Sequence, residues 1–235
     1  MARVEFDYFS PNELAENLWE VRGKWSNKLG RRMTVIRLSG NRLVLHSSIQ
    51  LEESELAWLQ SLGAPSFIVA PNIFHCSDAD WMAKKFPAAE VFVPASKLAE
   101  FTKKGFQPKD VNSQFPALLA NELKCIPMRG TRIDEAAFLH VPSKTLILCD
   151  LAFNMDDVFS GLEKWVMKWN RVGGHFGPSR ITKWLFAKNQ RALVESYEEL
   201  LNHDFDRVIV NHGEVLDSGG REKLRSGVEL IFGKI

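Results

Sequence analysis

The sequence predicts an α/β fold, and three observations support that class. Short apolar runs with strand character alternate with longer segments whose apolar residues recur at helical spacing. Pairs of neighbouring strands joined by short turns occur in both halves of the chain. Hydrophobic residues make up 45% of the 235 residues and charged residues 25%, which is typical of a globular protein.

The chain is expected to begin with an irregular segment and then to form one domain. Residues 1–30 show weak periodicity, so we expect a lead-in there and a single domain over residues 31–235. A hairpin opens the domain, because the β-rich runs 33–38 and 42–46 are separated by a short turn that contains Gly40. The elements expected next are a helix over 51–62, an apolar strand over 67–70, a helix through Trp81, Met82 and Phe86, and a strand over 90–93.

The second half continues with further strands and helices. Its expected elements are strands at 123–126, 136–141, 145–149 and 207–210, and helices over 156–169, from Leu193 to Leu201, and after Gly219 and Gly220. Trp165, Trp169 and Trp184 are expected mainly to pack on helix faces, with a lid over a site or a dimer surface as alternatives.

Charge and cysteine content argue against several classes of partner and site. Net charge is +1 and the basic runs are short and scattered, so neither nucleic acid nor a membrane surface is expected as a partner. No stretch approaches ~18 uninterrupted apolar residues, so no transmembrane helix is expected. The three cysteines lack CxxC spacing and the N-terminus has no apolar signal core, so we expect free thiols and a cytoplasmic protein.

Three polar residues share one placement, at or just beyond the end of an apolar strand. They are His75, Asp150 and His212. Open α/β sheets bind ligands at such ends, and two imidazoles with one carboxylate can hold a metal ion with open positions. The alternatives are structural: a histidine that hydrogen-bonds the backbone, an aspartate that caps a helix, and a turn at His212 and Gly213.

The segments around these strand ends follow a known pattern. Residues 67–75 resemble the signature region of the metallo-β-lactamase superfamily, in which a strand runs into a His-x-His-x-Asp-His motif. Residues 145–150 resemble the strand that ends in that family's bridging aspartate, and residues 209–214 resemble its terminal histidine on a His-Gly turn. Pro71 and Asn72 make the chain similar to a subgroup with a degenerate metal-binding motif.

The resemblance implies a four-layer αββα sandwich, and it also implies that several metal ligands are missing. With His75 as the last histidine of the motif, Ala70 and Asn72 take the places of the other two histidines. Phe74 takes the place of the aspartate, and no histidine follows near residues 129–131, where the family has one. The three strand-end residues remain, so the resemblance implies at most a mononuclear site.

Two hypotheses of function follow from the resemblance. In the first, His75, Asp150 and His212 hold one zinc, iron or manganese ion, and the protein is a metal-dependent hydrolase with an activated water as nucleophile. In the second, a non-catalytic relative keeps the fold without metal and binds a small molecule or a partner. Neither hypothesis names a substrate, and the chain is expected to be a monomer or a homodimer. Further candidates for the ligand pocket are Asn72, Cys76, His175 and Glu214.

Overall fold

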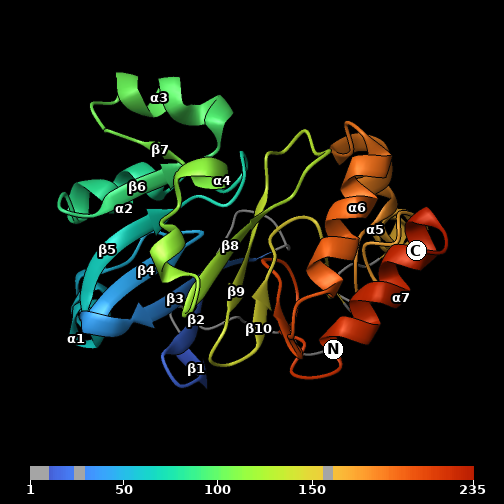
Figure 1. The fold of residues 1–235 in the computed structure, drawn as a ribbon, viewed down its shortest axis with the longest axis horizontal. Coiled ribbons are helices and arrows are strands. Elements are labelled where there is room, and N and C mark those ends of the chain that lie inside the picture. Colours follow the sequence, from blue (N-terminus) through green and yellow to red (C-terminus); the bar gives the residue numbers. More distant parts are fainter. Residues whose placement is uncertain (1–10, 24–29, 156–160) are drawn as a thin grey trace.

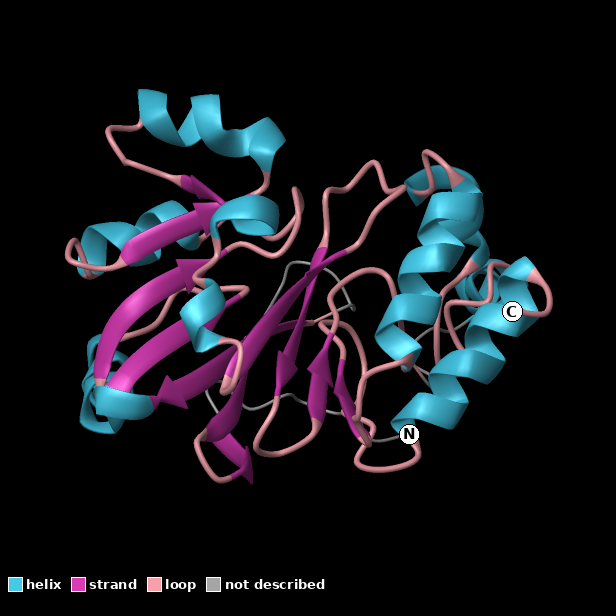
Figure 2. Cartoon of the chain, viewed as in Figure 1, coloured by secondary structure: helices cyan, strands magenta, loops and turns pink. Residues whose placement is uncertain are grey.

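The protein has four layers in the computed structural model, which describes residues 11–23, 30–155 and 161–235. Two β-sheets face each other in the middle, and helices cover the outer face of each sheet (Figure 1, Figure 2). The four-layer αββα sandwich expected from the resemblance is therefore confirmed.

The larger sheet has seven strands that follow one another in chain order. β1 to β4 pair antiparallel, and β4 to β7 pair parallel. Its strands are β1 (Pro11–Ala15), β2 (Leu18–Gly23), β3 (Arg31–Leu38), β4 (Arg42–His46), β5 (Ala64–Val69), β6 (Glu90–Val93) and β7 (Lys109–Asp110).

The prediction of an irregular lead-in over residues 1–30 is wrong for residues 11–23, because this segment forms β1 and β2. β2 pairs with β3, so that Leu18 lies opposite Ile36 and is fully buried between the sheets. The strand was hidden in the sequence because Glu20, a charged residue, stands at one of its buried positions. The other residues of the expected lead-in, apart from Gly30, lie outside the described residues.

The smaller sheet has four strands in the order β11-β10-β9-β8. β8, β9 and β10 pair antiparallel, whereas β10 and β11 pair parallel. Because β10 and β11 are parallel, both strands deliver the residues that follow them to the same edge of the sheet. The strands are β8 (Leu123–Pro127), β9 (Ala136–His140), β10 (Thr145–Ile147) and β11 (Arg207–Ile209).

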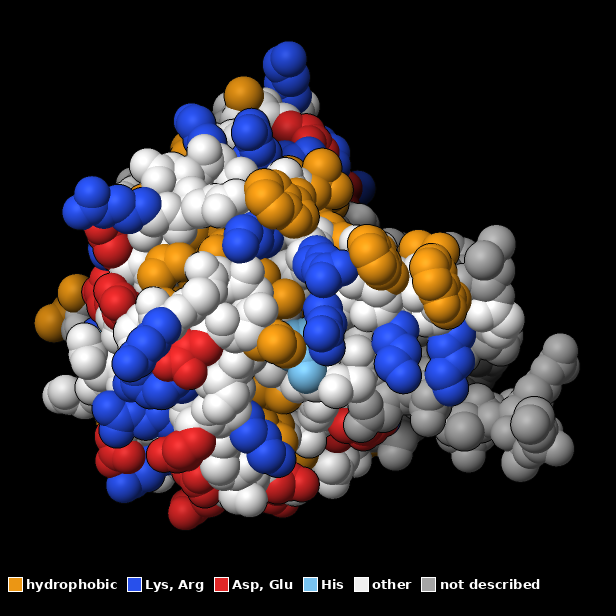
Figure 3. Space-filling model, turned by 90° about the vertical axis from the view of Figure 1, so that its right-hand side faces the viewer, with side chains coloured by type: hydrophobic (Ala, Val, Ile, Leu, Met, Phe, Trp, Pro, Cys, Tyr) orange, Lys and Arg blue, Asp and Glu red, His pale blue; other side chains and the backbone are white. Residues whose placement is uncertain are grey.

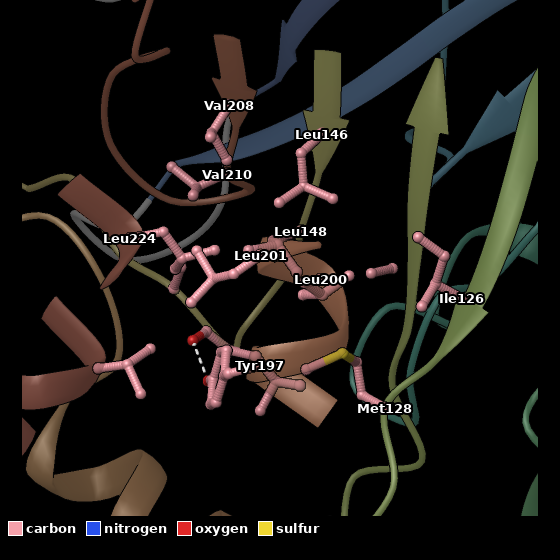
Figure 4. Packing of buried hydrophobic residues seen from close by; sticks show 14 of the residues in the cluster. Ile126, Met128, Leu146, Leu148, Tyr197, Leu200, Leu201, Val208, Val210 and Leu224 are labelled. Carbon is pink, nitrogen blue, oxygen red and sulfur yellow. Dashed lines mark hydrogen bonds between the residues drawn. The ribbon is translucent and has the colours of Figure 1, made fainter. Parts of the chain in front are cut away.

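Apolar side chains fill the space between all four layers. Phe138 lies between the sheets, where its ring meets the edges of the Phe115 and His46 rings. On the outer face of the smaller sheet, Tyr197 is fully buried and its hydroxyl donates to the carbonyl of Leu151 at 2.6 Å (Figure 4). The helices are α1 (Glu53–Leu62), α2 (Ala79–Lys85) and α3 (Leu98–Lys103) beside the larger sheet, α6 (Gln190–Leu201) and α7 (Gly220–Phe232) beside the smaller one, and α4 (Val111–Gln114) and α5 (Gly161–Trp169).

The tryptophans of the second half do not pack as the sequence predicted. Trp165 and Trp169 on α5 are 67% and 60% exposed, and Trp184 on the π-helix η4 (Thr182–Phe186) is 71% exposed. Helical spacing places Trp165 and Trp169 on one side of α5, but that side faces outward. The start of this helix, expected at Asp156, lies outside the described residues. Within the described part of the chain, no helix has both the length and the apolarity needed to cross a bilayer.

His46 is a titratable group in the apolar space between the sheets. It ends β4, is 3% exposed, and its ring centroid lies 5.3 Å from that of Phe138. Its Nε2 has no hydrogen-bond partner among the described residues. Burial lowers the pKa of His46 from 6.5 to about 3, because the charged imidazolium would lose its hydration there.

The buried His46 should make the protein less stable in acid. The unfolded chain binds a proton at this residue near pH 6.5, whereas the folded chain resists protonation down to about pH 3. The unfolded state therefore binds more protons between these values, and the free energy of unfolding should fall by up to about 5 kcal/mol as pH is lowered through them. Urea unfolding at several pH values measures this loss. His46→Leu should remove a large part of it, and a parallel loss in both proteins would show that other groups cause it.

Candidate functional site

The three strand-end residues meet at one buried carboxylate. His75 follows β5, Asp150 follows β10 and His212 follows β11, and all three side chains are buried. His75 Nε2 lies 3.2 Å from Oδ2 of Asp150, and His212 Nε2 lies 3.2 Å from Oδ1. The two imidazole ring centroids are 5.6 Å apart. The structure thus places one histidine on each oxygen of the same carboxylate.

Asn72 shapes the turn that carries His75 and also reaches Asp150. Its Oδ1 accepts hydrogen bonds from the backbone N–H groups of Phe74 and His75 at 2.9 and 3.1 Å, which closes the turn after β5. Its Nδ2 donates to Oδ2 of Asp150 at 2.8 Å and to Oε2 of Glu135 at 2.9 Å. A neutral amide therefore lies between two carboxylates in the interior.

Glu135 holds the backbone of the Asp150 segment and was not singled out from the sequence. It directly precedes β9 and is fully buried. Its carboxylate accepts from the N–H groups of Cys149 and Asp150 at 2.8 and 2.9 Å. Burial, and the nearby charge of Asp150, raise the pKa of Glu135 to about 7. In the sequence, the only signal was one acidic residue before an apolar strand, which is common and does not indicate a site.

The two carboxylates of this cluster have opposite pKa shifts. Burial opposes ionisation of Asp150, but the charge of His75 and the hydrogen bonds from both histidines outweigh it and lower the pKa of Asp150. Asp150 is therefore the negative charge of the site, to which both histidines and Asn72 are directed.

In each imidazole, the partner of Nδ1 decides which ring nitrogen carries the hydrogen. It therefore also decides whether Nε2 has a free lone pair. His212 Nδ1 lies 3.1 Å from the carbonyl oxygen of Gly30, which can only accept, so Nδ1 carries a hydrogen. His75 Nδ1 lies 3.0 Å from Oγ of Ser47, and that hydroxyl donates its own hydrogen to Asn211 at 3.1 Å. Nδ1 of His75 is therefore also a donor. When neutral, both imidazoles turn their Nε2 lone pairs towards Asp150, and Nδ2 of Asn211 also lies 3.4 Å from Nε2 of His75. A proton or a cation between each Nε2 and the carboxylate would turn these contacts into attractive ones.

A buried ion pair fixes the loop that carries His212. Arg32 on β3 is 3% exposed, and its Nε donates to Oε2 of Glu20 on β2 at 2.5 Å. The same guanidinium donates to the carbonyl oxygens of Val210 and Gly213, the latter at 2.7 Å. These two carbonyls lie on either side of His212, so the paired strands β2 and β3 hold this part of the site in place.

The remaining pocket candidates lie outside the contacts around Asp150. Cys76 is buried among apolar side chains between the larger sheet and its helices, and its thiol lies 3.3 Å from the carbonyl oxygen of Asn72. His175 is in a loop, where its Nε2 is 2.9 Å from the carbonyl oxygen of Pro178. Glu214 forms a surface ion pair with Arg22 at 2.6 Å.

Cys149 is a further potential ligand. It is fully buried, and its sulfur belongs to a group in which the donor atoms of His75, Cys149 and Asp150 all lie within 4.8 Å of one another. His212 is not part of that compact group. Burial raises the pKa of Cys149 well above its usual value, so its thiol stays protonated unless a cation binds beside it. All three cysteines are free, as the sequence predicted.

Among the described residues, the donor atoms close enough together for one ion are those of His75, Cys149 and Asp150, whereas His212 lies on the other oxygen of Asp150, outside that group. Two imidazoles whose outer nitrogens are held by Ser47 and Gly30, together with one carboxylate, are a set that zinc, iron and manganese accept. At the positions of the missing ligands, Asn72 turns its nitrogen and not its oxygen to the carboxylates. Phe74 is 48% exposed, and its ring packs 5.7 Å from that of Phe186.

Comparisons with known proteins identify the fold. No protein-family model matches the sequence, and no curated protein matches it. A crystal structure of the DIM-1 metallo-β-lactamase superposes on 95% of this chain and 98% of its own, with a TM-score of 0.63 and 13% identity. The chain has the metallo-β-lactamase fold.

Other solved structures with the metallo-β-lactamase fold agree with that result. The FIM-1 metallo-β-lactamase from Pseudomonas aeruginosa, in its mono-zinc form, covers 92% of this chain and 96% of its own, with a TM-score of 0.55 and 11% identity. A diflavin flavoprotein fragment from a Nostoc species covers 88% and 89%, with a TM-score of 0.61 and 14% identity. At these identities the likeness shows the metallo-β-lactamase fold and leaves the reaction to be argued from the site.

The buried Arg32–Glu20 pair should contribute more to the free energy of unfolding than the surface pair of Arg22 and Glu214. Arg32→Ala leaves Glu20 buried without its main partner and should lower the free energy of unfolding by about 3–5 kcal/mol. Arg22→Ala removes the surface pair with Glu214 and a longer, 3.6 Å contact to Glu20, and because Arg32 still pairs with Glu20 it should cost only about 0–1 kcal/mol. Urea unfolding of both variants measures the difference. Adding Glu20→Leu to the Arg32 variant should restore part of the loss, and equal costs for the two single variants would contradict the role given to Arg32.

Proposed function

We propose that the protein holds one divalent metal ion between His75, Asp150 and His212 and hydrolyses a small-molecule substrate there. The observation that carries the proposal is the convergence of two Nε2 lone pairs on the oxygens of Asp150, each 3.2 Å away. Ligating histidines commonly donate their other N–H to a fixed acceptor, as these two do. The neighbour FIM-1, crystallised with one zinc, supports a single-ion site in this fold.

The residues around the proposed ligands have separate tasks. Glu135 and Asn72 orient Asp150 through its backbone and its Oδ2, respectively. Ser47 and the carbonyl of Gly30 set the tautomers of the two histidines. The ring of Phe153 stacks on His212, with centroids 6.3 Å apart, and limits the approach of water from that side. A bound divalent ion would acidify a water molecule and polarise a substrate oxygen.

A second candidate is a non-catalytic protein that keeps this fold without metal. The specific observation in its favour is the Asn72 amide, which donates to both buried carboxylates where a second cation would otherwise balance them. With both histidines protonated, every contact to Asp150 is a hydrogen bond of ordinary length. In this case the pocket would bind a small molecule or a partner.

Metal content distinguishes the two candidates. Protein purified without added metal should contain close to one zinc, iron or manganese ion per chain by mass spectrometry. His75→Ala and His212→Ala should each lower the affinity for Zn²⁺ by at least about tenfold in calorimetric titration. Zn²⁺ should also raise the melting temperature of the metal-free wild type and not that of these variants.

Two further variants sharpen the metal experiment. His203→Ala removes a histidine of the α6–β11 loop and should leave Zn²⁺ affinity unchanged. Cys149→Ser should weaken binding only if the buried sulfur takes part. A folded wild type that neither contains nor binds any of the three metals would refute the metal site and favour the non-catalytic candidate.

A further inference from the structure

The second half of the chain presents an exposed apolar surface that the site does not use. Among the large apolar side chains exposed in the described residues, six of nine lie on α5, η4 and α7, with exposures from 44% to 71%. Figure 3 shows apolar side chains beside Lys and Arg on the end of the molecule that carries these elements. We call these six residues the tryptophan patch: Trp165, Val166, Trp169, Trp184, Leu185 and Leu230.

Ring contacts and a shared cavity connect Trp165, Trp169, Trp184 and Leu230 of the tryptophan patch. The rings of Trp165 and Trp169 stack with centroids 6.0 Å apart, and the guanidinium of Arg180 lies 4.8 Å from the Trp169 ring. Arg180, Trp184 and Leu230 then line one cavity of about 220 Å³. Side chains from three elements therefore form a single surface with a hollow in it.

The same surface concentrates positive charge. Residues 161–189 contain six basic side chains and one acidic side chain, although the whole chain has a net charge of only +1. The cavity is lined by Arg171, Arg180 and Lys183, together with apolar residues and no carboxylate. Arg180 and Lys183 donate to the backbone carbonyls of Trp169 and Ile231, and neither forms an ion pair with a carboxylate among the described residues. The partner of this surface should be anionic and should also offer an apolar phase.

An anionic lipid surface meets both requirements. Tryptophan is enriched at the boundary between headgroups and acyl chains, and basic residues bind anionic headgroups. Val166, Leu185 and Leu230 are aliphatic, which suits acyl chains better than stacked bases. A second copy of the chain fits poorly, because a two-fold interface would place the same cations against each other.

We propose that the tryptophan patch docks the protein on an anionic membrane surface, with headgroup phosphates in the cavity lined by Arg171, Arg180 and Lys183. This proposal departs from the expectation that no membrane surface is a partner, which rested on the net charge, because net charge averages over opposite faces of the molecule. Docking does not depend on the proposed metal. The patch nevertheless borders the candidate site, since Phe186 at the end of η4 contacts Phe74 beside His75.

Co-sedimentation of the full chain with lipid vesicles tests this proposal. At about 0.1 M salt the wild type should pellet with phosphatidylcholine vesicles that contain about 30% phosphatidylserine, and not with pure phosphatidylcholine. Raising the salt to about 0.5 M should release most of the protein, because screening weakens the attraction. The variants Trp169→Ala with Trp184→Ala, and Arg171→Glu with Lys183→Glu, should each bind at least about tenfold more weakly.

Matched control variants show whether the loss of an apolar side chain or of positive charge elsewhere on the molecule also weakens vesicle binding. Leu118→Ala removes an apolar side chain that is 97% exposed in another part of the chain. Lys84→Glu with Lys103→Glu reverses two charges on α2 and α3, at the opposite end of the molecule in Figure 1. These controls and His75→Ala should bind vesicles as the wild type does. Circular dichroism and urea unfolding check that every variant is folded.

Three outcomes would overturn the proposal. The first is a folded wild type that stays in the supernatant with both kinds of vesicle. The second is vesicle binding that the patch variants share with the wild type. The third is a wild-type dimer that the patch variants convert to a monomer in light scattering without any vesicle binding, which would make the patch a contact between copies of the chain.

Discussion

The carboxylate of Asp150 is the centre on which the rest of the site depends. A buried negative charge needs opposite partners and hydrogen-bond donors, and this one receives them from two segments of the chain, residues 72–75 and residue 212. One histidine reaches each oxygen, Asn72 reaches Oδ2, and Glu135 accepts from the N–H group of Asp150 itself. The ends of β5 and β11, which belong to different sheets, must therefore lie close together, because the histidines that follow them both contact Asp150.

A second buried charge links that centre to the start of the chain. Burial of the Arg32 guanidinium is offset by its ion pair with Glu20 on the adjacent strand. Its other N–H groups donate to two carbonyl oxygens near His212. β2 and β3 thus take part in the site, although neither Glu20 nor Arg32 contacts Asp150. They position the loop after β11 that carries His212, so a substitution in these strands would affect the site about 180 residues away in sequence.

Much of the fold could be predicted from the sequence, whereas the site could be predicted only in part. Strand ends identified His75, Asp150 and His212, since apolar runs that stop at a polar residue are visible without coordinates. Glu135 could not be found in this way, because its role depends on which backbone N–H groups lie within reach after folding. Helical spacing put Trp165 and Trp169 on one side of α5 but did not say whether that side meets the core or water.

The division of the two sheets along the chain has a consequence for synthesis on the ribosome. All seven strands of the larger sheet lie within residues 11–110, and the smaller sheet begins only at Leu123. The larger sheet can therefore pair while the later strands are still being translated, with the apolar face that will meet the smaller sheet open to water. Its edge and its open face then lack their partners, and the centre around Asp150 closes only after His212 has left the exit tunnel.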